Sequence, residues 1–218
     1  MNGKSLLISI LFLYTLLNGC IDTTSENYFT GTIEYAYSYS SDSLNTDSLI
    51  RIRPAKSFFR YDTIAYQSRF IGTDTATYYY DGTLNKCVSE TGDNEYEYEC
   101  EDYGSAADSV LSVKIYDTEL KILGYECRII ELQKKRSWIK YYFSKELIMA
   151  PLTYKHHRSY NWDIYGEKTN GGLVLKLEHR FQTFTMQGTA TAIKESDPDF
   201  IALELDKKRI AEICNIKN

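Results

Sequence analysis

An alternation of large apolar and small or polar side chains over residues 29–40 is the feature that most restricts how this chain can fold. Ile33, Tyr35, Tyr37 and Tyr39 occupy every second position of that stretch. A period of two places all four on one side of an extended chain, so the segment predicts a half-buried β-strand. The 218 residues include 20 tyrosines and 3 prolines. Tyrosine favours strands and buries its ring while its hydroxyl stays hydrated, so the composition also indicates a β fold.

Further strands are expected where short apolar runs lie between polar breaks, at 48–53, 57–62, 65–71, 137–143, 172–180 and 182–194. Short helices are expected at 105–111, at the Lys145–Met149 turn and at 206–214. The sequence shows no internal repeat with a period of roughly 20–50 residues, which excludes a repeat array. It therefore predicts one mainly β domain over residues 28–218, with one or two short helices that include one at the C-terminus.

The N-terminus has the organisation of a bacterial lipoprotein signal. A positive charge at Lys4 precedes an apolar stretch, 5–17, that is shorter than the roughly 20 residues a spanning helix needs. The stretch ends at Leu17, Gly19 and Cys20, which resemble a lipobox. We therefore expect residues 1–19 to be a signal peptide, Cys20 to carry the lipid, and residues 20–27 to form a tether. The alternative is a short membrane anchor that is never cut.

The lipid on Cys20 is the expected membrane contact, because two or more acyl chains hold a protein stably in a bilayer. The expected location is therefore the bacterial cell envelope, on the periplasmic or surface face of the outer membrane. Loss of Lys4 with the signal changes the formal net charge from −5 to −6. This acidic balance argues against nucleic acid as a partner, since binding it requires a basic patch.

Four cysteines remain when Cys20 is lipidated: Cys87, Cys100, Cys127 and Cys214. An even number in an exported chain indicates disulfide bonds. Cys127 is expected either as a buried thiol or as half of a second bridge to Cys214.

Cys87 and Cys100 flank a turn near residues 92–95. If Asp93-Asn94 is a two-residue hairpin loop, the cysteines lie opposite each other at a non-hydrogen-bonded pair, with Cα atoms about 4.5 Å apart. That separation permits a disulfide. The sequence therefore predicts a Cys87–Cys100 bridge, which would contribute roughly 3 kcal/mol in the chain-entropy model.

The same register sorts the side chains of this region. The Asp81-Gly82 pair between two strand-like runs predicts the preceding hairpin. One face should then be aromatic and buried, with Tyr78, Tyr80, Cys87, Tyr96, Tyr98 and Cys100. The other should be an acidic face in water, with Glu95, Glu97, Glu99 and Glu101. A calcium site is the alternative, but alternate strand residues project in parallel and do not converge on one ion.

No motif for metal binding or catalysis is evident. His156 and His157 are neighbours, so on a strand they point to opposite faces, and no spaced cysteine or histidine partner accompanies them or His179. A nucleophile elbow and a glycine-rich phosphate loop are also missing from the sequence. A dispersed Ser–His–Asp set remains an alternative. We therefore expect a protein that is not an enzyme and that needs no metal or cofactor.

Several short motifs resemble those of the half-barrel lipoproteins of the GLPGLI type, which are similar in outline to the LolA/LolB lipoprotein-sorting fold. The motifs are Gly31–Tyr35, Ile122–Cys127, Gly172–Lys176 and Thr189–Ile193. The chain departs from the pattern at Val174, where proline is common. The resemblance implies a strongly curved antiparallel sheet with a concave apolar face, partly covered by a helix. In the sorting proteins that concavity holds acyl chains, but no individual ligand residue can be transferred.

Two functions follow as expectations. In the first, the concave face binds a lipid, an acyl chain or another apolar ligand. In the second, the chain is an envelope or cell-surface interaction protein, and its sheet is a packed core without a cavity. The first predicts tyrosine, phenylalanine and isoleucine side chains around an open cavity. The second predicts that the chain itself fills that space.

Overall fold

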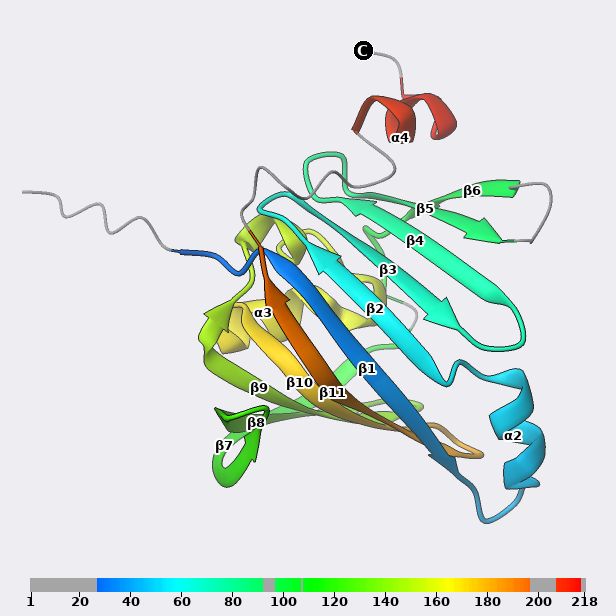
Figure 1. Ribbon diagram of the computed structural model, residues 1–218, viewed down its shortest axis with the longest axis vertical. Helices are drawn as coiled ribbons and strands as arrows, with labels where there is room; N and C mark the ends of the chain where they lie inside the picture. Colours follow the sequence, from blue (N-terminus) through cyan, green and yellow to red (C-terminus); the bar gives the residue numbers. More distant parts are fainter. Residues whose placement is uncertain (1–26, 92–96, 107, 197–206, 217–218) are drawn as a thin grey trace, which may run out of the picture.

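The computed structural model describes residues 27–91, 97–106, 108–196 and 207–216. In these residues, one antiparallel sheet of eleven strands curves strongly but does not close (Figure 1). Its spatial order is β6-β5-β4-β3-β2-β1-β11-β10-β9-β8-β7. The strands are β1 (Gly31–Ser40), β2 (Lys56–Tyr61), β3 (Ala65–Ile71), β4 (Thr75–Asp81), β5 (Lys86–Thr91), β6 (Glu97–Asp102), β7 (Val110–Ile122), β8 (Tyr125–Lys134), β9 (Trp138–Ile148), β10 (Gly172–Arg180) and β11 (Thr185–Glu195). The predicted fold class, a mainly β chain built on a single curved antiparallel sheet with short helices, is confirmed.

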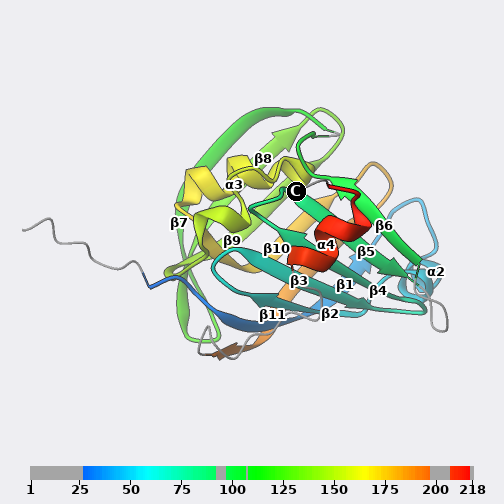
Figure 2. The same ribbon diagram turned by 90° about the horizontal axis from the view of Figure 1, so that it is seen from above.

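The sheet consists of two wings, each a run of strands that pair in chain order. We call β1–β6 the N-terminal wing and β7–β11 the C-terminal wing. Pairing of β1 with β11 joins the wings in the middle, so that β6 and β7 lie at the two edges. Register shifts at Glu34/Tyr35 and in the β9–β10 pair mark irregularities that bend strands locally. Seen from above, the wings curve around a central space (Figure 2).

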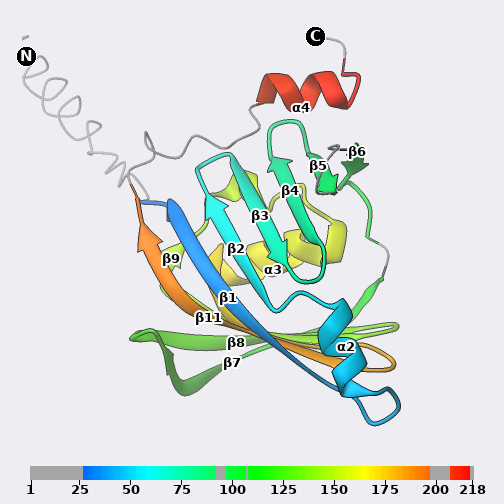
Figure 3. The same cartoon turned by 45° about the vertical axis from the view of Figure 1, so that its right-hand side comes forward.

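The described helical segments have three locations. The 3₁₀ turns η1 (Pro151–Thr153) and η2 (Ser159–Asn161) and helix α3 (Trp162–Thr169) connect β9 to β10 and lie on the concave side of the sheet (Figure 3). Helix α2 (Thr46–Ile52) follows β1. Helix α4 (Lys207–Ile213) lies on the opposite, convex side of the N-terminal wing, where Ile210 packs on Tyr79 and Val88. The predicted C-terminal helix is therefore confirmed.

The alternation that opens the chain forms the strand it predicts. On β1, Ile33, Tyr35 and Tyr39 are buried, and Tyr37 packs against the same core. The intervening Glu34, Ala36 and Ser38 are more exposed. Ile33, Tyr35, Tyr37 and Tyr39 therefore face the concave side, and the period-two pattern correctly identified the inner face of the strand.

Three local predictions are wrong. Residues 48–53 lie largely in α2 instead of a strand, because Asn45 caps the helix by accepting from the backbone N–H of Ser48 at 3.0 Å. The expected helix 105–111 overlaps the start of β7, and Asp108 accepts there from the Ser137 hydroxyl at 2.8 Å. The Lys145–Met149 turn belongs mostly to β9. Tertiary contacts from distant strands decide the last two segments, and local propensity does not report them.

In the described part of the chain, no helix is both long and apolar enough to cross a membrane. Cys20 and the expected signal peptide lie outside the described residues.

Candidate functional site: a filled concave face and two surface hollows

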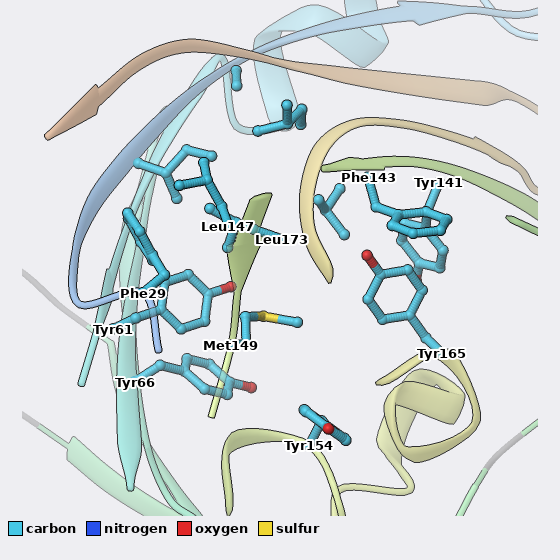
Figure 4. Packing of buried hydrophobic residues seen from close by; sticks show 14 of the residues in the cluster. Phe29, Tyr61, Tyr66, Tyr141, Phe143, Leu147, Met149, Tyr154, Tyr165 and Leu173 are labelled. Carbon is cyan, nitrogen blue, oxygen red and sulfur yellow. The ribbon is translucent and has the colours of Figure 1, made fainter. Parts of the chain in front are cut away.

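Side chains from the connection between β9 and β10 fill the concave face of the sheet. Figure 4 shows Met149, Tyr154 and Tyr165 between the tyrosines of the N-terminal wing and the aromatic residues of β9. Each of these three side chains is at most 8% exposed. Residues 149–171 therefore act as a closing segment, and we use that name for them below.

Tyr165 of α3 is the centre of this packing. Its ring stacks on Trp162 with centroids 4.6 Å apart and meets Tyr141 of β9 edge-on at 4.7 Å. Its hydroxyl donates a hydrogen bond to the carbonyl of Gly172 at the start of β10. Burial raises the pKa of the Tyr165 hydroxyl well above its usual value. A buried ring whose hydroxyl has a backbone partner makes a fixed core contact.

Glycine allows the closing segment to approach its own neighbours closely. A Cβ atom on Gly166 would lie 2.1 Å from the Tyr154 ring, and one on Gly82 would lie 1.8 Å from the Leu152 carbonyl oxygen. Gly82 belongs to the β4–β5 turn, so the closing segment contacts that hairpin directly. The predicted Asp81-Gly82 hairpin is present, with Asp81 opposite Lys86 across it.

A second buried cluster lies where the closing segment meets β3, β4 and the end of β6. His157 is 3% exposed, and its Nε2 atom lies 2.7 Å from the Tyr66 hydroxyl. Its ring contacts Tyr80 and Tyr103, with centroids 4.7 and 4.4 Å away. The Cys87 thiol of β5 is buried and interacts with Tyr103.

The electrostatics of this cluster oppose catalysis by Cys87. Burial raises the pKa of the Cys87 thiol to about 12 and lowers the pKa of His157 to about 3. Both groups are therefore neutral near pH 7. A cysteine nucleophile needs the reverse, a thiolate stabilised by a nearby cation. The arrangement suits a rigid core better than a reactive pair.

The surface of the described residues includes two hollows of different character. The larger, about 580 Å³, lies at the base of β1 and is lined by Asn27, Tyr28, Phe29, Thr30, Tyr125, Glu146, Leu147, Ile148, Glu195 and Ser196. The smaller, about 340 Å³, is lined by Asn85, Gly104, Lys155, His156, Arg158 and Asp163. Because the lining of the second includes three basic side chains and one carboxylate, we call it the basic hollow.

The predicted Cys87–Cys100 bridge is wrong. Cys100 is bonded to Cys214 of the α4 end, with Cα atoms 5.3 Å apart, and Cys87 and Cys127 are free buried thiols. The second predicted pair, Cys127 with Cys214, is therefore wrong as well. Of the two alternatives for Cys127, the structure has the buried thiol.

A shift of one residue in the β5–β6 register explains the error. Cys87 lies opposite Glu101, and Cys100 lies opposite Val88. A one-residue shift reverses which face each side chain occupies. Cys100 consequently points to the convex side with Val88, where α4 lies, while Glu101 shares the concave side with Cys87. The predicted sorting of Cys100 and Glu101 is wrong, and Glu95 and Tyr96 lie outside the described residues.

The histidines are not brought together. His156 lines the basic hollow, His157 is buried beside Tyr66, and His179 is buried against Phe181. In the described residues, no group of three or more histidine, cysteine, aspartate or glutamate side chains is placed to hold a metal. The residues that sequence reasoning missed are Lys155 and Arg158 in the basic hollow. The run Lys155-His156-His157-Arg158 was a usable signal for them.

Together these features define a class: an open, strongly curved antiparallel β domain whose concave face is filled by its own chain. Comparison with known protein families finds no match, and comparison with curated proteins finds none. Among solved structures, the chain is similar to two structures of PNGF-II, one in space group P21 and one in C2. The TM-scores are 0.45 and 0.44, and the sequence identities are 15% and 16%. The similarity covers 83% and 86% of this chain, which spans 30% of the length of each PNGF-II chain.

Proposed function

We propose that this chain is a lipid-anchored envelope protein that works through its surface, as a non-enzymatic interaction module. The observation that carries the proposal is the filled concave face. Of the two functions expected from the sequence, one needs an apolar cavity on that face and the other needs a packed core. The burial of Met149, Tyr154 and Tyr165 there supports the packed core.

The disulfide supports an exported location. Cys100 and Cys214 form a bond between the convex side of the sheet and the C-terminal helix. Such bonds persist in oxidising compartments such as the bacterial periplasm and the cell surface. Together with the lipobox at Leu17, Gly19 and Cys20, this favours an anchored protein on the outer side of the cytoplasmic membrane.

The pKa values around the buried cysteine support a non-enzymatic role. Cys87 and His157 are both held neutral near pH 7, and Cys127 is a second buried thiol whose pKa burial also raises. Buried, protonated thiols are inert as nucleophiles.

Lipid analysis of the native protein tests the proposal. The lipidated chain is purified from the native cell envelope. Lipid that can be extracted from it is quantified by mass spectrometry, and the lipid bound covalently to Cys20 is not counted. We expect no stoichiometric apolar ligand. The variant Tyr165→Ala serves as the positive control, because loss of a fully buried ring leaves a cavity in the concave face. One bound lipid or fatty acid per unmodified chain would support the apolar-ligand function instead.

A further inference from the structure

The basic hollow stands out because it opposes the charge of the molecule. The chain has 30 acidic and 25 basic side chains, yet Lys155, His156 and Arg158 line this one hollow with a single carboxylate, Asp163. Arg158 and Asp163 approach only to 3.9 Å, so the carboxylate holds the guanidinium loosely. An arginine with free N–H donors binds phosphate or carboxylate groups with two parallel hydrogen bonds.

Two further polar groups complete the lining. Asn85, at the end of the β4–β5 turn, accepts a hydrogen bond from the Tyr80 hydroxyl on Oδ1 at 3.0 Å. That bond fixes the amide and leaves its nitrogen as a donor. The Asp163 carboxylate is a hydrogen-bond acceptor. An acceptor can bind the hydroxyls of a sugar, whereas a bare anion needs donors. The lining therefore combines cationic donors for an anion with neutral and acidic groups for hydroxyls.

The backbone around the hollow is held in place from several sides. The Arg158 backbone N–H donates to the Tyr103 carbonyl at 2.7 Å, and the Asp163 backbone N–H donates to the His157 carbonyl at 2.9 Å. Below it, the buried His157 ring packs between Tyr80 and Tyr103. The backbone that carries the lining is therefore ordered before binding, and that part of the ordering entropy is not lost when a ligand arrives.

The backbone between Arg158 and Asp163 is strained at Tyr160. It lies between Arg158 and Asp163 in the chain, is 66% exposed, and has a φ of 58°, followed by Asn161 with a φ of 62°. A large non-glycine residue in the left-handed region costs roughly 1–2 kcal/mol. The carbonyl of Tyr160 accepts from the buried Lys134 ammonium at 3.1 Å, which holds the backbone there.

We propose that the basic hollow binds a sugar that carries an anionic group, either a phosphate or a carboxylate. Lys155, His156 and Arg158 hold the anion, and Asn85 and Asp163 bind the hydroxyls of the sugar. A volume of about 340 Å³ exceeds the space of an anion alone and lies at the small end of ligand pockets. This inference goes beyond the proposed function and holds whether or not Cys20 is lipidated.

Calorimetric titration of the full chain at low salt tests the proposal with four probes: glucose 6-phosphate, glucuronate, glucose and inorganic phosphate. We expect saturable binding of at least one anionic sugar, with affinity at least tenfold above that for glucose and for inorganic phosphate. The variant Lys155→Gln/Arg158→Gln should weaken it at least tenfold. The variant Lys145→Gln/Lys168→Gln removes the same charge from exposed positions outside the hollow and should leave affinity unchanged.

Each other outcome has a defined meaning. Saturable binding of glucose 6-phosphate alone or of glucuronate alone supports the proposal and identifies the anion. Equal affinity for inorganic phosphate overturns the assignment of a sugar. The absence of saturable binding, or an equal loss in both double variants, overturns the site itself. Circular dichroism of both variants at the titration temperature confirms that they are folded.

Discussion

At the residue scale, two histidines of the molecule, His157 and His179, are neutral because they are buried. His157 packs against Tyr66, Tyr80 and Tyr103, and burial lowers its pKa to about 3. His179 faces Lys134 and Asp108, and burial, reinforced by the Lys134 charge, lowers its pKa to about 4. Both imidazoles thus remain uncharged far below the pH at which they would protonate in water.

These two histidines make stability depend on pH. The unfolded chain binds a proton on each near pH 6.5, whereas the folded chain does so only near pH 3 and pH 4. The unfolded state therefore binds more protons between these values, and the free energy of unfolding falls as pH falls. Between pH 6.5 and pH 5 we expect a loss of about 2 kcal/mol per histidine, measured by urea unfolding. His157→Gln/His179→Gln should flatten this slope, and an unchanged slope in the double variant would contradict the assignment.

At the element scale, α4 is attached to the sheet by one covalent bond and a small apolar contact. Ile210 packs on Tyr79 and Val88, and Cys214 is bonded to Cys100. A helix of seven residues has little stability of its own, so these two contacts hold it in place.

Removal of the bond should therefore release the helix first. Cys100→Ser/Cys214→Ser is expected to lower the free energy of unfolding by about 2–5 kcal/mol, the usual cost for a native disulfide that closes a long loop. Hydrogen exchange should accelerate at Val88 and Ile210 before it does at β1. Cys87→Ser/Cys127→Ser retains the bond and is the control for cysteine replacement. Non-reducing peptide mapping that finds Cys87 bonded to Cys100 would refute the structure of this hairpin.

The elements also show how far sequence reasoning reaches. The inner face of β1 and the C-terminal helix follow from periodicity, because each pattern extends over a whole element. The β5–β6 register could not be predicted from periodicity, because it depends on the length of the connection. Thr91 pairs with Glu97, so five residues connect the strands and not two. The resulting register differs from the predicted one by one residue, so Cys100 and Glu101 lie on the faces opposite to those predicted. The basic hollow combines Asn85, Gly104 and the closing segment, and no local pattern indicates that these segments meet.

At the scale of the whole molecule, the proposed membrane contact and the β domain are separate. The expected tether, residues 20–27, leads directly to β1, and in the described residues no helix is suited to span a bilayer. In the proposed function, the lipid on Cys20 attaches the domain to the membrane.

Cys20→Ala should abolish incorporation of labelled palmitate into the chain, because Cys20 is the residue that carries the lipid in the proposed function. Label should persist in Cys87→Ala and Cys127→Ala, which remove thiols that the structure shows buried. Membrane fractionation and gel fluorography measure both results. Palmitate that remains on the Cys20→Ala chain would contradict the lipoprotein assignment.

The order of the strands also determines when the fold can form. Within each wing, strands pair with their neighbours in the chain, so both wings can form from local contacts. The β1–β11 seam pairs Gly31 with Glu195, almost the whole length of the domain apart. Contacts between such distant residues slow folding, because the entropy of closing the loop is lost before any pairing compensates for it. For a chain that is exported N-terminus first, β1 emerges long before β11 and must wait, with its second edge unpaired, until translocation is nearly complete. If the chain is exported as we propose, the strand order requires that this edge be protected during export.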